Sequence, residues 1–241
     1  MKIEKFDSLE STNKYCEALD LAQVEDFTCY WALEQTAGIG QRGNHWASAP
    51  GENLTFSLVL KPDFLPAADQ FRLTQALSLA LVDFLSAFGF RFPISIKWPN
   101  DIYVDGKKIC GTLTSTRLAG DRITAAICGI GLNVNQVTFP DWVPHPTSLS
   151  LLTGRRHDLE PLLAQLLQHI ETRYDELRRG VGHNEAYLDR LMNRNVEAHY
   201  LYEGKEITAT VTGVDRYGHL QLTAADGRRL SCAMKEIVFL P

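Results

Sequence analysis

Residues 35–46 contain three glycines, one arginine and one tryptophan, and they lie between two segments with the pattern of strands. Glycine permits positive φ angles, so the backbone N–H groups of such a loop can turn inward and form a concavity that binds anions. Arg42 can add the planar set of donors of a guanidinium group. The loop therefore predicts a site for an anion, although glycine-rich segments also serve as simple connections.

The same loop contains the spacing G-x-G-x-x-G at Gly38, Gly40 and Gly43. In a dinucleotide-binding fold, this spacing leads into a helix whose N-terminus faces a pyrophosphate. Here residues 47–53 have the composition of a turn, and residues 54–60 alternate as a strand does. The pattern therefore indicates a long loop between two strands and argues against the dinucleotide fingerprint.

A second group of polar residues lies in the segment 97–101 (Lys-Trp-Pro-Asn-Asp) and continues with Lys108. Pro99 interrupts strand pairing, so Asn100 and Asp101 are predicted at a strand end, where their side chains can point into a cleft. Taken singly, these residues also fit a turn and a solvated charge. Together with the glycine-rich loop, they provide anion donors, a carboxylate able to bind a metal, and a point cation.

The predicted strand 122–134 carries glycines at alternate positions, Gly129 and Gly131, followed by Asn133. Alternate residues of a strand face the same side, so one face of this strand is bare. We expect another backbone or a ligand to approach closely there.

Hydrophobic periodicity and turn residues predict helices and strands of an α+β fold. The predicted helices cover residues 11–22, with Ser11 or Thr12 as N-cap, 69–88, 159–179, with Asp158 as N-cap, and 183–193. The predicted strands cover residues 28–33, 54–60, 94–98, 102–104, 107–113 and 122–134, and residues 136–147 are predicted as a loop. Asp105-Gly106 between two strand-like segments indicates a hairpin.

From residue 194 the pattern changes to short alternating segments, at 196–202, 207–214, 220–223, 230–234 and 237–240. Five short strands predict a small β-barrel. We therefore expect two domains, 1–193 and 194–241. The smaller one is expected to lean on the larger, because so short a segment is marginal as an independent core.

The 241 residues carry a net charge of −5 and no densely basic segment, so the composition does not indicate nucleic-acid binding. The first residues lack the apolar core of a signal peptide, and no apolar run has membrane-spanning length, so we expect a cytoplasmic protein. The five cysteines form no C-x-x-C pair, and the seven histidines show no ligand spacing. Buried reduced thiols and no structural metal are therefore predicted.

Taken in order, these blocks resemble the biotin–protein ligase family, which attaches biotin to a lysine of carboxylase carrier domains. The resemblance runs through residues 10–13 (Glu-Ser-Thr-Asn), 34–46, 97–101, 107–111 and 129–133, and it continues into the C-terminal segment. It implies a class II synthetase-like catalytic domain with a mixed, mainly antiparallel sheet and packed helices, and an SH3-like barrel after it. It also implies an enzyme that uses biotin and ATP with Mg²⁺ to form biotinyl-5′-AMP and then acylates a biotin carboxyl carrier protein.

The resemblance further implies roles for individual residues. Lys108 and Arg42 are expected to be catalytic, because attack of a carboxylate on the α-phosphate brings two anions together and needs positioned cations. The expected biotin contacts are Ser11, Thr12, Asn13, Gln35, Gly38, Ile39, Gly40, Gln41, Lys108 and Gly111. The expected ATP and adenylate contacts are Gln41, Arg42, Asn44, Trp46, Lys97, Asn100, Asp101 and Asn133, with Asp101 also the candidate Mg²⁺ ligand.

The loop departs from the commonest form in the family, which carries basic residues where this chain has Ile39 and Gln41. Fewer fixed charges predict either weaker retention of the acyl-adenylate or greater reliance on Arg42, Lys108 and Mg²⁺. In the second step, the acceptor lysine must lose a proton although its ordinary pKa is about 10.4. Asp101 is a candidate base, and metal binding could equally occupy it.

Other functions are less consistent with these residues. Some members of the family carry an N-terminal winged helix and repress genes, but the Ser-Thr-Asn motif begins here at residue 11, so we expect no DNA binding. Lipoate or octanoate transfer is the alternative activity, and the block 97–101 together with the C-terminal barrel favours biotin. A binding module without catalysis is disfavoured by the presence of Lys108, Arg42 and Asp101. A homodimer is compatible with the family, and the sequence identifies no interface for one.

Overall fold

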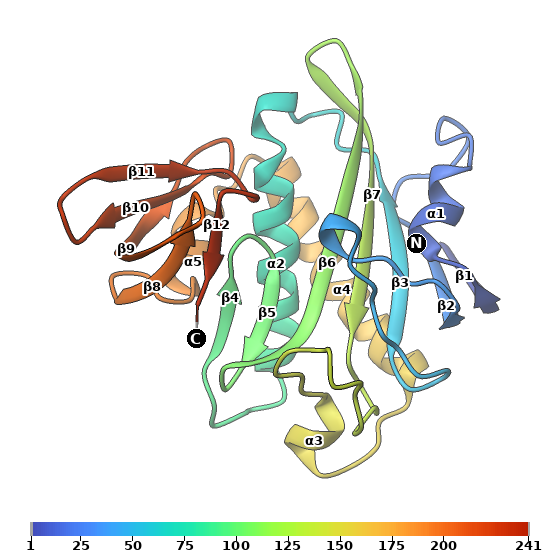
Figure 1. The fold of residues 1–241 in the computed structure, drawn as a ribbon. Helices are drawn as coiled ribbons and strands as arrows, with labels where there is room; N and C mark the ends of the chain where they lie inside the picture. Colours follow the sequence, from blue (N-terminus) through green and yellow to red (C-terminus); the bar gives the residue numbers. More distant parts are fainter. Residues whose placement is uncertain (1, 241) are drawn as a thin grey trace.

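The structure, a computed structural model, describes residues 2–240, apart from the side chain of Arg42. A seven-stranded sheet with helices is followed by a five-stranded sheet (Figure 1). The first sheet contains β1 (Lys2–Leu9), β2 (Thr28–Gln35), β3 (Leu54–Leu60), β4 (Ile94–Lys97), β5 (Asp101–Val104), β6 (Lys107–Ala119) and β7 (Arg122–Leu132). The second contains β8 (Glu197–Tyr202), β9 (Lys205–Val214), β10 (Leu220–Ala224), β11 (Arg229–Cys232) and β12 (Ile237–Phe239). The α-helices are α1 (Thr12–Glu17), α2 (Phe71–Ser86), α3 (Leu149–Thr153), α4 (Leu159–Arg178) and α5 (Asn184–Asp189).

The large sheet has the strand order β1-β2-β3-β7-β6-β5-β4. β1 and β2 are parallel, and the other neighbouring strands of this sheet are antiparallel. The small sheet has the order β11-β10-β9-β8-β12. The predicted α+β class with a mixed, mainly antiparallel sheet is therefore confirmed.

The two faces of the large sheet are covered differently. On one face, alternate residues such as Trp31 and Leu58 belong to the main core, which includes α2 and α4. On the other face, Tyr30 and Val59 pack with Cys16 of α1. Figure 1 shows α2 and α4 on one side of the sheet and α1 near β1, β2 and β3. In the part of the chain that the structure describes, no core helix covers the second face at the glycines of β7, so other segments of the chain can lie against it there.

Most predicted elements are present, with shifts at their ends. The helix predicted over 11–22 ends at Glu17, and Asp20 Oδ1 accepts the Ala22 N–H at 3.1 Å just beyond it. A side chain that takes a backbone N–H in this way competes with the next helical turn. α4 begins at the predicted cap, because Asp158 Oδ1 accepts the Glu160 N–H at 3.3 Å.

Other differences concern elements with weak sequence patterns. β6 extends the strand predicted over 107–113 to Ala119, and α5 covers only part of 183–193. β1 and α3 have no counterpart among the predicted elements. β1 is an edge strand whose residues are mostly exposed, so it lacks the apolar alternation that marks a half-buried strand.

The small sheet contacts the large one near the start of α2. Trp98 Nε1 donates to the Gly218 carbonyl at 3.0 Å, and Arg216 Nε lies 2.9 Å from Asp69 Oδ1. Gly218 has a φ of 90°, and a Cβ at this position would collide with the Phe71 ring, so this contact requires glycine. The five C-terminal strands are present as predicted, and the domain boundary at 193/194 stays a prediction.

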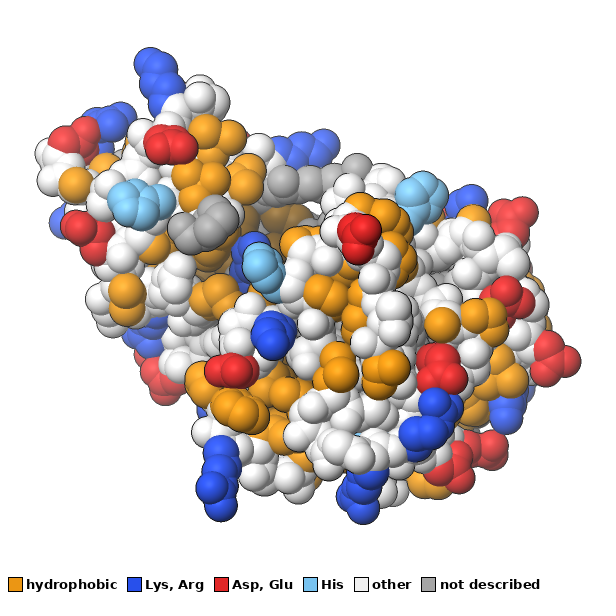
Figure 2. Space-filling model, turned by 60° about the horizontal axis from the view of Figure 1, so that its bottom comes forward, with side chains coloured by type: hydrophobic (Ala, Val, Ile, Leu, Met, Phe, Trp, Pro, Cys, Tyr) orange, Lys and Arg blue, Asp and Glu red, His pale blue; other side chains and the backbone are white. Residues whose placement is uncertain are grey.

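The surface and the thiols agree with the composition. On the face drawn in Figure 2, Lys and Arg side chains are scattered among Asp and Glu, and no large basic patch is seen. All five cysteines are buried and free, as predicted, and burial raises the pKa of Cys16 to about 12. Among the described residues, no helix is both long and apolar enough to cross a membrane.

Candidate active site

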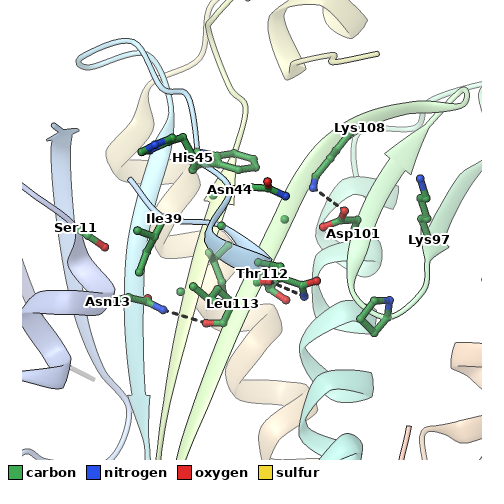
Figure 3. Close-up of a pocket in the computed structure, with 18 of the residues that line it drawn as sticks. Ser11, Asn13, Ile39, Asn44, His45, Lys97, Asp101, Lys108, Thr112 and Leu113 are labelled. Atoms are coloured by element: carbon green, nitrogen blue, oxygen red, sulfur yellow. Dashed lines mark hydrogen bonds and ion pairs between the residues drawn. The ribbon is translucent and has the colours of Figure 1, made fainter. Parts of the chain in front are cut away.

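A cleft of about 320 Å³ lies over the glycines of β7, with walls from α1, the glycine-rich loop, the β5–β6 hairpin and β12. The predicted site residues that line it are Ser11, Thr12, Asn13, Gln35, Ile39, Gly40, Gln41, Asn44, Trp46, Lys97, Asp101, Lys108 and Gly111. We call Ser11, Thr12, Asn13 and Gln35 the neutral end, and Lys97, Asp101 and Lys108 the cationic end. Figure 3 shows Ser11 and Asn13 on one side of the cleft and the cationic end on the other.

The glycine-rich loop folds back on itself above the cleft. Gly40 N donates to the Asn44 carbonyl at 2.7 Å, and Trp46 N donates to the Gly38 carbonyl at 3.0 Å. Between them, residues 41–43 form a single 3₁₀ turn. The absence of an α-helix after this loop confirms that the G-x-G-x-x-G spacing is not a dinucleotide fingerprint.

Gln41 attaches the loop to the floor of the cleft. Its Nε2 donates to Asn100 Oδ1 at 2.8 Å, and Asn100 Nδ2 in turn donates to the Thr112 carbonyl at 2.9 Å. The side chain at position 41 therefore points at the strand end after Pro99. The side chain of Arg42, the other predicted loop contact, lies outside the described residues.

The bare face predicted for β7 is confirmed. A Cβ on Gly131 would collide with the indole ring of Trp46, and a Cβ on Gly129 would collide with the amide of Asn13. Trp46 Nε1 is buried and has no hydrogen-bond partner among the described residues. The glycines therefore make room for two side chains that line the cleft, one from the loop and one from α1.

The β5–β6 hairpin contains a β-bulge. Ile102 pairs with Cys110, whereas Tyr103 pairs with Lys108, so Ile109 is an extra residue on β6. Side chains alternate along a regular strand, so an extra residue changes which positions share a face.

The bulge brings Lys108 and Gly111 to the same face. A Cβ on Gly111 would lie 3.3 Å from Lys108 Cε and 3.2 Å from Asp101 Oδ1. Lys108 Nζ and Asp101 Oδ2 are 2.6 Å apart and form a partly exposed ion pair (Figure 3). Because Gly111 has no side chain, the Lys108 side chain can lie over it and face the cleft.

Lys97 lies between two aromatic rings that come from different sheets. Its Nζ is 5.7 Å from the Tyr103 ring centroid on β5 and 5.4 Å from the Phe239 ring centroid on β12. Burial lowers its pKa, with Asp101 acting in the opposite direction and Lys108 adding to the decrease. No carboxylate among the described residues forms an ion pair with Lys97, so aromatic faces are its main counterpart.

The neutral end is hydrogen-bonded, with Ser11, Thr12 and Asn13 buried and Gln35 half-buried. Thr12 N donates to Gln35 Oε1 at 2.7 Å, and Asn13 Nδ2 donates to the Leu113 carbonyl at 3.2 Å. Ser11 is the N-cap residue of α1, but its side chain makes no capping hydrogen bond. Its hydroxyl is therefore free of the structural role that a cap would give it.

Of the predicted site residues that the structure fully describes, three do not line the cleft. Gly38 lies at the base of the loop, and Asn100 lies one layer behind the lining, where it holds Gln41 and Thr112. Asn133 is buried, with its Nδ2 donating to the Thr147 carbonyl at 2.9 Å. Their predicted ligand contacts stay predictions.

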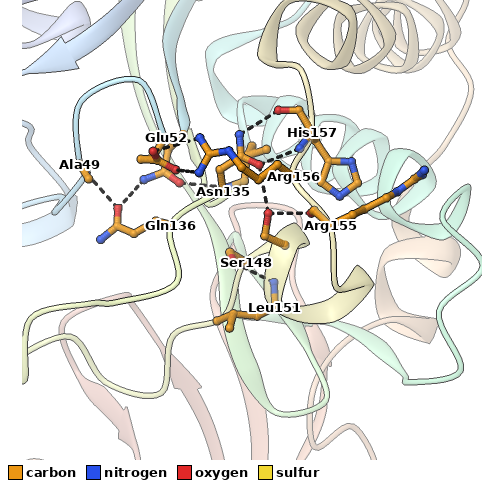
Figure 4. A network of polar contacts seen from close by, with 12 residues as sticks. Ala49, Glu52, Asn135, Gln136, Ser148, Leu151, Arg155, Arg156 and His157 are labelled. Carbon is orange, nitrogen blue, oxygen red and sulfur yellow. Dashed lines mark hydrogen bonds and ion pairs between the residues drawn. The ribbon is translucent and has the colours of Figure 1, made fainter.

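The segment that follows Asn133 is held by other amide side chains (Figure 4). Gln136 Oε1 accepts from Ala49 N at 2.9 Å and from Asn53 Nδ2 at 2.6 Å. Asn135 Oδ1 accepts from His157 N at 2.8 Å. These contacts join the end of β7 to the segments before β3 and α4. Asn133 therefore lies in a segment that is held by structural hydrogen bonds.

Part of the lining was not predicted from the sequence. The additional residues include His45, Phe56, Trp98, Pro99, Thr112, Leu113, Ile130, Ile237, Val238 and Phe239. The three residues of β12 had no local sequence pattern that links them to a site more than 100 positions away. His45 lies at the cleft because the loop folds back on itself, and Ile39 and His45 form an isolated β-bridge there.

The described residues do not form a metal site of their own. No group of three His, Cys, Asp or Glu side chains is placed to hold a metal ion among them. Among the residues that the structure describes, Asp101 is the only carboxylate that lines the cleft, and it is already paired with Lys108. A Mg²⁺ ion in this cleft would therefore depend on phosphate oxygens for most of its ligands.

Comparison with known proteins agrees with this arrangement. The model of the biotin/lipoate A/B protein ligase family matches residues 5–133, more than half of the chain. The bifunctional ligase/repressor BirA of Bacillus spizizenii is 36% identical over 171 residues, which are 70% of this chain and 52% of that protein. BirA of Escherichia coli is 28% identical over 221 residues, 89% of this chain and 67% of that protein. The chain spans about half the length of the first curated relatives that it matches.

A solved structure is similar over its whole length. The biotin protein ligase from Aquifex aeolicus in complex with biotin and ATP has a TM-score of 0.81 and 26% identity, and the match covers 99% of this chain and 98% of that one. The fold with both sheets is thus shared with a protein whose structure was solved with biotin and ATP. Fold, cleft and family match together show that this chain belongs to the biotin/lipoate A/B protein ligase family.

Proposed function

We propose that this protein activates biotin with ATP to biotinyl-5′-AMP and transfers the biotin to a lysine of a carboxylase carrier domain. One observation carries the proposal: a single cleft joins a buried neutral end, suited to a polar uncharged head group, to an end with two lysines, suited to a carboxylate and a phosphate. The relative from Aquifex aeolicus, with biotin and ATP bound, supports this choice of ligands.

Biotin would lie with its ureido ring at the neutral end. A neutral polar head in a buried site needs paired donors and acceptors, and the Ser11 hydroxyl, Thr12 and Gln35 provide them. Asn13 supports this wall from α1, and Gly111 leaves space where the chain of biotin would pass toward Lys108. The loop residues Ile39, Gly40 and Gln41 would cover the ligand from above, and Gly38 would hold the base of that loop.

Lys108 is assigned the central role in the first step. An oxygen of the biotin carboxylate attacks the α-phosphorus of ATP, an O–P bond forms, and the bond to the β-phosphate oxygen breaks, which releases pyrophosphate. Two anions approach each other in this step, and a fixed ammonium group stabilises the charge that develops. Asp101 holds Lys108 in place through the ion pair of 2.6 Å.

The nucleotide would occupy the cationic end. Lys97 and Arg42 are assigned to the phosphates, and Asn44 and Trp46 to the adenosine, with the Trp46 ring as a stacking surface. Asn100 would act through Gln41, and Asn133 through the loop that follows β7. Mg²⁺ would enter with ATP and neutralise phosphate charge, with Asp101 within reach only if its pairing with Lys108 is rearranged.

In the second step, the amine of the carrier lysine attacks the acyl carbon of the adenylate. A C–N bond forms, AMP leaves with the electrons of the C–O bond, and the amine loses a proton. We assign this reaction to the cytoplasm and propose no DNA partner, and a homodimer is compatible with it.

Mass spectrometry of a carboxylase carrier domain tests the proposal, after incubation with this protein, biotin and Mg-ATP. We expect a mass increase of one biotin on one lysine, and no increase without ATP. Parallel reactions with lipoate and octanoate test the alternative transfer activity. Modification by either of these acids in preference to biotin would replace the proposal with the lipoate-type function, and no modification by any acid would contradict both.

A further inference from the structure

Ser57 is a polar residue that lies directly behind the neutral end. It is fully buried on β3, opposite Gly129 in the sheet, on the face that carries the cleft. Its Oγ lies 2.8 Å from Thr12 Oγ1 and in hydrogen-bond contact with Asn13 Oδ1. The strand around Ser57 is otherwise buried and mainly apolar, so the hydroxyl requires an explanation.

Ser57 belongs to a row of four oxygen atoms. Gln35 Oε1 contacts Thr12 Oγ1 at 3.1 Å, Thr12 Oγ1 contacts Ser57 Oγ, and Ser57 Oγ contacts Asn13 Oδ1. The row therefore has three O···O contacts. Only the two hydroxyl groups carry protons, so one of the three contacts has no proton.

The two amide oxygens cannot be exchanged for NH₂ groups. The Thr12 backbone N–H can only donate, and it lies 2.7 Å from the Gln35 amide, so the atom facing it must be Oε1. The Leu113 carbonyl can only accept, so the Asn13 atom facing it must be Nδ2. Oδ1 of Asn13 then faces Ser57, and both ends of the row are acceptors.

Distances assign the missing proton to the Thr12–Gln35 contact. The contacts made by Ser57 are the shorter two, and two oxygens approach so closely only with a proton between them. Ser57 then donates to Asn13, and Thr12 donates to Ser57. The Thr12–Gln35 contact is the longest, and Gln35 Oε1 already accepts the Thr12 N–H.

We propose that Ser57 is a positioning residue that leaves Thr12 Oγ1 and Gln35 Oε1 as a pair of acceptors at the wall of the cleft, ready for a ligand N–H. Both residues line the cleft, whereas Ser57 does not. The ligand class that fits is a cyclic urea or amide with an N–H at its edge. The identification of this ligand as biotin rests on the proposed function.

The test compares biotin with two analogues in which one ureido N–H or the other is replaced by a ring oxygen. Binding to the full chain is measured by calorimetry without ATP. We expect the wild type to bind biotin at least about tenfold more tightly than the analogue that lacks the N–H facing Thr12. In Ser57→Ala, the Thr12 hydroxyl can donate to Gln35 Oε1, so the two acceptors are no longer both available to the ligand. The preference should then fall to about twofold, and biotin should bind about 5–50-fold more weakly.

Two further variants control the experiment. Ser78 is also a fully buried serine, it lies on α2, and its hydroxyl has no partner within the described part of the chain, so Ser78→Ala should keep the full preference. Thr12→Val removes one oxygen of the pair with little change of shape, so it should lose the preference even if Ser57→Ala does not fold.

Specific outcomes would overturn the inference. If Ser57→Ala or Thr12→Val keeps the wild-type preference for the N–H ligand, the acceptor pair does not act as described. If the wild type binds biotin and both analogues equally well, the inference fails while the proposed function stands. If the wild type binds no biotin at all, the proposed function fails first.

Discussion

The two ends of the cleft are built by different kinds of interaction. At the neutral end, the residues from α1 and β3 are buried, Gln35 of β2 is half-buried, and short hydrogen bonds connect them. At the cationic end, Lys97, Asp101 and Lys108 are partly exposed, and an ion pair and aromatic faces hold them. Hydrogen bonds depend on direction, whereas charge acts over a distance. The neutral end is therefore suited to choosing the ligand, and the cationic end to stabilising charge in a reaction.

The largest expected effect is the loss of Lys108 at the cationic end. Lys108→Ala should lower biotin-dependent ATP–pyrophosphate exchange by about 10²–10³-fold, because it removes the cation and leaves Asp101 to repel the incoming carboxylate. Lys107 is the exposed neighbour on the same strand, and Lys107→Ala should exchange at the wild-type rate. Near-normal exchange in Lys108→Ala, with an unchanged melting temperature, would remove Lys108 from the first step.

Asp101 tests whether the carboxylate serves the lysine or the metal. Asp101→Asn should lower the exchange rate about tenfold, since Lys108 loses a charged hydrogen-bond partner. The Mg²⁺ concentration for half-maximal rate should stay unchanged, as measured by titration at saturating ATP. A strong rise in that concentration would show that Asp101 binds the metal.

Lys97 should give the cationic end its pH dependence. Burial lowers its pKa, so the ammonium group loses its proton at a lower pH than an exposed lysine would, and ATP affinity should fall as the pH rises through that value. Arginine stays charged at these pH values, so Lys97→Arg should move the alkaline decline of kcat/KM for ATP to higher pH. An identical decline in both proteins would assign it to another group.

Gln41 links the loop to the cationic end. Gln41→Ala removes the hydrogen bond to Asn100 and should release biotinyl-5′-AMP about 2–10-fold faster, measured by rapid filtration with labelled biotin. Gln41→Arg places a cation where the commonest family loop has one. An unchanged release rate in both variants would mean that residue 41 does not help to hold the intermediate.

The smallest expected effect concerns Phe239 on β12. Phe239→Leu keeps an apolar contact but removes the aromatic face near Lys97, and ATP should bind about 2–5-fold more weakly. In a Lys97→Met background the same change should have no further effect on the dissociation constant. Phe92, an exposed phenylalanine outside the cleft, provides the control Phe92→Ala.

The sequence predicted the elements whose residues have clear periodicity. The apolar pattern of α2, the glycines of β7 and the Asp105-Gly106 turn are local features, and local chemistry decides them. Thirteen of the predicted site residues line one cleft, because blocks that are distant in sequence lie on neighbouring strands.

The parts that were missed depend on contacts between distant segments. Ser57 is an unremarkable serine in a strand until Thr12 and Asn13 are placed beside it. Phe239 enters the cleft only because the small sheet packs near Trp98. Asn133 fits the motif of the family, but its amide is used by the backbone at Thr147. Periodicity and motifs contain no information about such packing.

The extra residue at Ile109 has a consequence for how this protein can change during evolution. Replacing Ile109 keeps the number of residues between Lys108 and Gly111, and both stay on the cleft side. The spacing of three residues and the bulge depend on each other, because a regular strand with this spacing would turn lysine and glycine to opposite sides, whereas deleting Ile109 together with the bulge would leave them two positions apart on one face. Length changes at the exposed tip, residues 105–106, leave that spacing intact. Natural variation should therefore permit insertions and deletions at the tip, and should keep or lose Ile109 and the bulge together, so that the inherited trait is a residue count matched to a strand register.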